Sequence, residues 1–193
     1  MGYYDYWPQA TLEKPIAFIG FPGSQSAAVG YTLAALLGLA YNEIERVIEH
    51  KAGQDAASLR RNKPNSYMAC HDVALKDALV RKPAGIIVLG DTTLENIDTA
   101  AQLRRETTLV YIKRPMGVLF QTVRRSIRDG RPFADFTTSS LKSIDAFEQI
   151  FRVRSPSYQK AEIIFDALDT HPNTVAQQLI ALLKLKHLSL SPH

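Results

Sequence analysis

The sequence has only one cysteine, Cys70, among 193 residues, so no disulfide can form within the chain. It also lacks a signal-peptide pattern and any apolar run of about 18 residues, which argues against export and membrane insertion. Long basic runs are missing too, because the basic residues are scattered in pairs and the formal net charge is only +4. We therefore expect a soluble cytoplasmic protein that binds small anionic molecules rather than nucleic acid or membranes.

The length and the 46% hydrophobic content suit one domain with a full-sized core. We assign residues 15–187 to that domain, residues 1–14 to an N-terminal arm and residues 188–193 to a flexible tail. The arm is rich in aromatic side chains, which either pack on the domain surface or form a contact for self-association or a protein partner. These side chains are Tyr3, Tyr4, Tyr6 and Trp7.

Short apolar runs alternate with segments of helical periodicity along the chain. The runs at 15–19, 84–90, 108–115 and 163–167 read as strands. The segments at 27–40, 44–53, 94–106, 116–129 and 143–162, and the one that follows Pro172, read as helices. This alternation predicts a doubly wound α/β domain with a parallel sheet.

The stretch "GFPGSQSAAVG", residues 20–30, lies between the first strand and the first helix, where a phosphate-binding loop belongs. Such a loop reads G-x-x-x-x-G-K-[ST]. When Gly20 is aligned with the first glycine of this pattern, the loop has the right length and position. However, Gln25 replaces the last glycine, Ser26 the lysine and Ala27 the metal-binding hydroxyl residue. We expect Gln25 to narrow or reshape the loop. The residues expected to contact a nucleotide are Gly20, Gly23, Ser24, Gln25, Ser26 and Ala27.

Taken in order, this loop, "LGLAY", "GIIVLG", "LVYIKRP", "RDGRPF" and "RSPSY" make residues 14 to 187 resemble shikimate kinase. The resemblance implies a P-loop kinase fold with a parallel five-stranded sheet flanked by helices. It further implies a lid segment over ATP, and a place in aromatic amino-acid biosynthesis.

The resemblance also assigns roles to individual residues. Ser26 and Ala27 replace the lysine and the hydroxyl that hold phosphate and magnesium. "GDT" at 90–92 replaces a glycine triplet, so Asp91 adds negative charge beside the expected substrate carboxylate. No arginine occurs in "YMACHD", where the family's early substrate arginine is expected. The remaining assignments are Glu43 near magnesium, Glu45 on the substrate hydroxyls, Arg131 in the lid and Arg154 on the substrate carboxylate. Apart from the resemblance, we expect Arg124 to contact a nucleotide as a cation from another element.

Two functions remain open at this point. The first is a shikimate-kinase-like pseudokinase that has lost phosphotransfer and acts by binding a small molecule or a protein partner. The alternative is an active ATP-dependent kinase of shikimate, or of a related small hydroxy acid, with relocated catalytic groups. No cofactor is certain, and ATP or ADP with magnesium stays a hypothesis under both readings.

Overall fold

The computed structural model describes residues 10–168, 171–184 and 189–190. Its centre is a parallel sheet of five strands in the order β3-β4-β2-β5-β6, which confirms the predicted α/β fold. The strands are β2 (Ile16–Ile19), β3 (Tyr41–Glu43), β4 (Ile86–Val88), β5 (Thr108–Lys113) and β6 (Ile163–Asp166).

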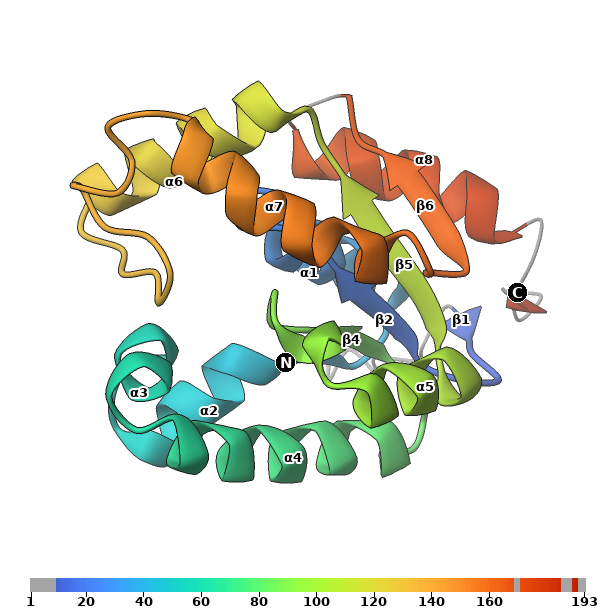
Figure 1. The fold of residues 1–193 in the computed structure, drawn as a ribbon. Coiled ribbons are helices and arrows are strands. Elements are labelled where there is room, and N and C mark those ends of the chain that lie inside the picture. Colours follow the sequence, from blue (N-terminus) through green and yellow to red (C-terminus); the bar gives the residue numbers. More distant parts are fainter. Residues whose placement is uncertain (1–9, 169–170, 185–188, 191–193) are drawn as a thin grey trace, which may run out of the picture.

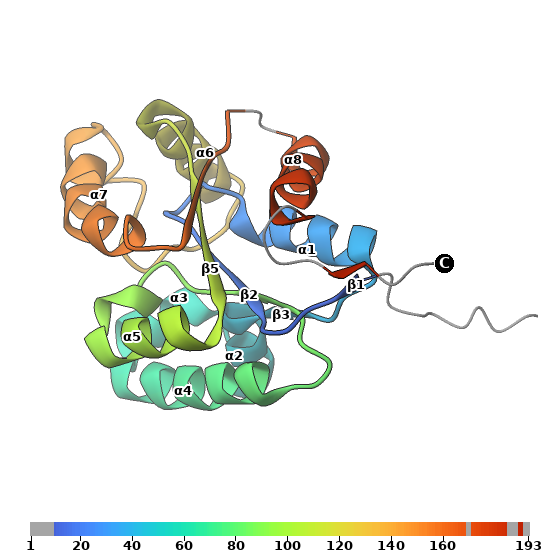
Figure 2. The same ribbon diagram turned by 90° about the vertical axis from the view of Figure 1, so that its right-hand side faces the viewer.

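Helices cover both faces of this sheet (Figures 1 and 2). One face packs against α1 (Ser26–Leu37) and α8 (Pro172–Lys184). The other face packs against α2 (Ile44–Ala52), α3 (Ala56–Asn62), α4 (Pro64–Val80), α5 (Ile97–Glu106), α6 (Met116–Arg128) and α7 (Asp145–Tyr158). In the described part of the chain, no helix combines the length and apolar character that a membrane crossing requires.

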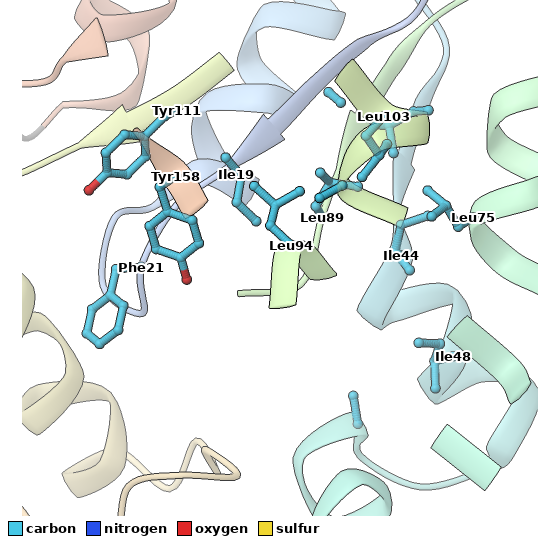
Figure 3. Close-up of a cluster of buried hydrophobic side chains, with 14 of the residues drawn as sticks. Ile19, Phe21, Ile44, Ile48, Leu75, Leu89, Leu94, Leu103, Tyr111 and Tyr158 are labelled. Carbon is cyan, nitrogen blue, oxygen red and sulfur yellow. The ribbon is translucent and has the colours of Figure 1, made fainter. Parts of the chain in front are cut away.

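The two faces explain why the central strands β2, β4 and β5 are largely apolar. Ile19 and Tyr111 belong to the cluster under α2 to α7, whereas Phe18 and Val110 belong to the cluster under α1 and α8. Successive side chains point to opposite faces of a strand, so a strand covered on both sides must be apolar at every position. Figure 3 shows the first cluster, with Tyr111 beside Tyr158 at a ring separation of 5.2 Å.

The structure adds elements that the sequence analysis did not assign. Helices α3 and α4 fill residues 56–80, and the short 3-10 helix η1 (Thr93–Glu95) precedes α5. Strand β1 (Ala10–Thr11), in the expected arm, pairs antiparallel with β7 (Ser189–Leu190), in the expected tail. The aromatic residues Tyr3, Tyr4, Tyr6 and Trp7 lie outside the described residues.

The expected helix at 143–162 is shorter in the structure, where α7 ends at Tyr158. The other expected helices end within a few residues of their predicted limits.

Candidate functional site

A cleft of about 340 Å³ lies beyond the carboxyl ends of β2, β3 and β4. This is the edge at which open parallel sheets bind ligands. Its walls come from the loop at 20–27, the end of β3 with the start of α2, helix α3, the end of β4, and residues 131–136. The five segments are far apart in the sequence and meet only because the strands are parallel.

The loop between β2 and α1 has the turn of a phosphate-binding loop. Gly23 has φ +90°, and a β-carbon there would lie 2.6 Å from the carbonyl oxygen of Leu119, so no larger residue fits. Gln25 precedes α1 at φ 62° and ψ 25°, a left-handed conformation that glycine adopts more readily. The turn is therefore kept at the expense of strain in Gln25. The side-chain oxygen of Gln25 is shielded from solvent and accepts no hydrogen bond from the described residues.

Glu43 ends β3 close to this loop. The Tyr41 hydroxyl contacts both the carbonyl oxygen of Ala27, at 3.2 Å, and Oε2 of Glu43, at 3.0 Å. Burial and the charge of Glu43 raise the pKa of Tyr41, so its hydroxyl stays protonated and can donate to the carboxylate. This contact ties Glu43 to the first turn of α1.

Glu45, in the first turn of α2, lines the same cleft. Burial and the negative charge of Asp91 raise its pKa to about 7, although Arg60 and Arg131 act in the opposite direction and Glu49 adds to the rise. Near neutral pH the Glu45 carboxyl is therefore divided between its charged and neutral forms.

Arginines from α3 and α7 converge on carboxylates at the inner wall of the cleft. Arg60 contacts Asp91, with Nη1 2.8 Å from Oδ1, and also Asp135. Arg154 contacts Asp91, Asp135 at 2.9 Å and Glu95 at 2.6 Å. Two guanidiniums and three carboxylates thus form one network. We refer to Arg60, Arg154, Asp91, Asp135 and Glu95 as the ion network.

The ion network is mostly shielded from solvent, since the Arg154 side chain is only 7% exposed and that of Asp91 12%. Burial alone would lower the pKa of Arg60 and of Arg154, but Asp91 and Asp135 outweigh it and raise both pKa values. The Tyr158 hydroxyl donates to the backbone carbonyl of Asp91, and burial raises the pKa of Tyr158, which keeps that donor protonated. The Asp91 backbone and side chain are therefore both fixed.

The segment between α6 and α7, residues 129–144, forms the outer wall and reaches toward α3 (Figure 1). It is held there by the two ion pairs of Asp135 and by Arg61, which donates to the backbone oxygens of Phe133 and Ala134. Phe136 is buried and packs on Phe21 and Phe147. The expected lid therefore lies closed on α3.

Most of the residues singled out from the sequence meet at this cleft. Its lining includes Gly20, Gly23, Ser24, Gln25, Ser26, Ala27, Glu43, Glu45, Asp91 and Arg131. Arg154 lies behind Asp91, in a neighbouring cavity of about 270 Å³. Arg124 is exposed on α6 over the ring of Phe120 and is not among the described residues that line the cleft.

The sequence analysis missed two charged members of the site and misread a third. Arg60, one helix before "YMACHD", pairs with Asp135, which lies only four residues beyond Arg131. Asp91, which was expected to add negative charge beside a substrate carboxylate, is itself paired with two guanidiniums. Asp55 offered a signal for α3, because its side chain accepts the N–H of Ser58 as a helix N-cap.

The described residues contain no group of three or more histidine, cysteine, aspartate or glutamate side chains placed to hold a metal ion. Glu43 therefore has no such group around it among these residues.

The parallel sheet, the glycine-containing loop before α1 and the lid define the chain as a protein of the P-loop kinase fold. The family model of shikimate kinase matches residues 22–184, and the chain belongs to the shikimate kinase family. A shikimate kinase of Chlorobaculum parvum is 28% identical over 153 residues, which cover 77% of this chain and 81% of that protein. One of Caulobacter vibrioides is 21% identical over 174 residues, or 90% of this chain and 84% of that protein.

Solved structures of the same family share the fold. Shikimate kinase from Acinetobacter baumannii in complex with shikimate superposes with a TM-score of 0.73 at 21% identity, covering 90% of this chain and 96% of that one. Shikimate kinase from Bacteroides thetaiotaomicron gives a TM-score of 0.72 at 21% identity, with coverages of 89% and 98%. At sequence identities this low, the likeness to these two structures shows the fold alone.

Proposed function

We propose that this member of the shikimate kinase family binds a small molecule in the cleft without transferring a phosphoryl group, and acts as a regulatory or partner-binding protein. The observation that supports this proposal most is the missing positive charge in the loop before α1. At the start of α1, Ser26 stands in place of the lysine and Ala27 in place of the metal-binding hydroxyl, so the first position lacks a cation and the second lacks a hydroxyl. Phosphoryl transfer depends on positioning and electrostatic stabilisation, and one added arginine is worth roughly 10³–10⁵ in rate.

The cations available elsewhere do not compensate. Among the described residues that line the cleft, the only positive side chains are Arg60 and Arg131, and Arg60 is held by Asp91 and Asp135. Lys113 pairs with Asp166 at 2.8 Å, away from the cleft lining.

A nucleotide bound with magnesium fits this cleft only in part. The backbone amides at the start of α1 suit a phosphate, as at any helix N-terminus. The side chains do not, because six carboxylates and two guanidiniums line the same space.

The alternative, an active kinase with relocated groups, has one observation in its favour. Arg131 comes from the lid, lines the cleft and stacks on the ring of Phe133, at 5.9 Å. An arginine that enters a site on a closing segment is one way to supply positive charge to a phosphoryl group.

A product assay separates the two functions. The protein is incubated with ATP, magnesium and shikimate, and shikimate phosphate is followed by mass spectrometry. We expect no product; a turnover above about 1 s⁻¹, the low end of kinase rates, would establish the alternative.

The triple variant Gln25→Gly, Ser26→Lys, Ala27→Ser tests the loop itself. It should bind ADP, measured by calorimetry, while shikimate still goes unphosphorylated. The matched control is Ala28→Lys, which adds the same charge two residues further along α1 at an exposed position outside the cleft lining. If Ala28→Lys restores ADP binding equally, general charge rather than the loop is responsible. Ready phosphorylation of shikimate by the triple variant would show that the substrate side of the cleft is intact.

A further inference from the structure

The two guanidiniums of the ion network are already occupied by carboxylates of the chain. Arg154 uses Nε, Nη1 and Nη2 on Glu95, Asp91 and Asp135, and Arg60 uses both terminal nitrogens on Asp91 and Asp135. A ligand carboxylate would have to displace Asp91 or Asp135 and leave that charge unpaired in a shielded position. Such an exchange is unfavourable because an unpaired charge is poorly tolerated away from water.

The rest of the cleft is acidic. Outside the ion network, its lining has one guanidinium, that of Arg131, among the described residues. Four carboxylates face it, those of Glu43, Glu45, Glu49 and Asp55. The chain as a whole has a formal net charge of +4, so the negative charge belongs to this cleft and not to the protein at large. A partly enclosed charge of one sign attracts ligands of the opposite sign.

One shielded oxygen in the cleft lining, the side-chain oxygen of Gln25, has no hydrogen-bond partner among the described residues and can accept a donor. Tyr67, which is 2% exposed, lines the neighbouring cavity instead, with the Arg60 guanidinium 6.0 Å from the centre of its ring. A β-carbon built on Gly90 would lie 3.3 Å from the Tyr67 hydroxyl and 3.1 Å from Oε1 of Glu45, so these two oxygens both lie close to Gly90.

We propose that the cleft binds a small hydroxylated molecule that carries an amino group, and that it disfavours the carboxylate-bearing counterpart. The ammonium group of the ligand would lie among Glu45 and the neighbouring carboxylates, and a ligand hydroxyl group would donate to the side-chain oxygen of Gln25. A volume of about 340 Å³ is at the small end of ligand sites and suits a molecule of one ring. This inference rests on the proposed function only in taking the cleft as a ligand site.

A series of three ligands with one ring tests the charge preference. The probes are shikimate, the compound with a hydroxymethyl group in place of the carboxylate, and the compound with an aminomethyl group there. Calorimetric titration at pH 8 and low salt should give the order aminomethyl, hydroxymethyl, shikimate, with roughly tenfold between neighbours. If shikimate binds as tightly as the amine, or if none of the three binds below about 1 mM, the inference is wrong.

Two variants assign the preference to residues. Glu45→Gln should weaken the amine about tenfold and leave the hydroxymethyl compound unchanged, because only the charge is removed. Equal weakening of both would indicate a merely structural role and contradict the inference. Asp91→Gly combined with Asp135→Asn should release the two guanidiniums and reverse the order in favour of shikimate. Asp135→Asn alone, which preserves the side-chain shape, should shift the order in the same direction if the double variant does not fold.

The same titrations, repeated with ATP and magnesium and followed by mass spectrometry, keep the two proposals apart. A phosphorylated product from any probe would overturn the loss of phosphotransfer while leaving the charge preference intact. Tighter binding of shikimate without any product would overturn the charge preference alone.

Discussion

Removal of the Arg154 guanidinium should destabilise the protein more than any comparable change on the same helix. The variant Arg154→Met keeps most of the side-chain length but leaves Glu95, Asp91 and Asp135 short of a partner. Breaking a buried ion pair in this way typically costs about 3–5 kcal/mol.

Two features of the ion network reduce that figure here. The Glu95 side chain is 50% exposed and that of Asp135 29%, so water replaces part of the lost interaction. Arg60 also stays on Asp91 and Asp135. We therefore expect a loss of about 2–3 kcal/mol in the free energy of unfolding. For a domain of this size that corresponds to a fall in melting temperature of roughly 5–10 °C.

Urea unfolding followed by circular dichroism, together with thermal melts, measures both quantities. The matched control is Arg152→Met, two residues away on α7, where the side chain is 76% exposed and pairs only with Glu148 at 3.2 Å. Exposed pairs of this spacing contribute about 0.3–0.5 kcal/mol. A difference between the two variants of less than about 1 kcal/mol would mean that the ion network adds no more than a surface pair.

Two further predictions concern single positions. Glu45→Gln should raise the melting temperature at pH 8 and have little effect at pH 4.5. Because the pKa of Glu45 is raised to about 7, the folded protein binds one proton more than the unfolded chain between about pH 4.5 and 7. The stability of the wild type therefore falls as the pH rises through this window. The control Glu13→Gln, at an exposed position, should leave the pH dependence of the melting temperature unchanged. If Glu45→Gln shows the same pH dependence as the wild type, the assignment of this dependence to Glu45 is wrong. Gly30→Ala should destabilise the protein by about 1–3 kcal/mol, because the added β-carbon would lie 2.7 Å from Cγ2 of Val88. Gly117→Ala, on α6 with no atom within 4 Å of the added β-carbon, should stabilise it by about 0.5–1 kcal/mol. Equal urea midpoints for the two variants would show that Val88 moves aside at little cost.

The centre of the sheet could be predicted from the sequence because β2, β4 and β5 are buried on both faces and read as apolar runs. The edge strands differ, since β3 carries polar residues and β6 is partly exposed. The runs that hold β2, β4 and β5 need no tertiary information to be recognised. Helices α3 and α4 lack such a pattern, since charged and apolar residues are mixed in both. Their signals were local and small, namely the capping side chain of Asp55 and Pro64 at the first position of α4.

The ion network could not be predicted, because its members are brought together only by the fold. Arg60 is 31 residues from Asp91 and 75 from Asp135, and Arg154 is 63 residues from Asp91. The sequence shows each charge but not its partner. Asp91 therefore looked like an obstacle to an anionic ligand, whereas in the structure it occupies the guanidiniums that such a ligand would need.

The loop before α1 keeps the backbone turn of a phosphate-binding loop while its side chains differ from those of such a loop. Gln25 holds a left-handed conformation at a cost of about 1 kcal/mol relative to glycine, because the turn from β2 into α1 is set by the packing on both sides of it. The same packing places Ser26 and Ala27 at the start of the helix regardless of their side chains. Likeness to the shikimate kinase family therefore accounts for where the cleft lies. Which molecule enters it depends on the side chains that line it, and in this chain the charged ones are mainly carboxylates.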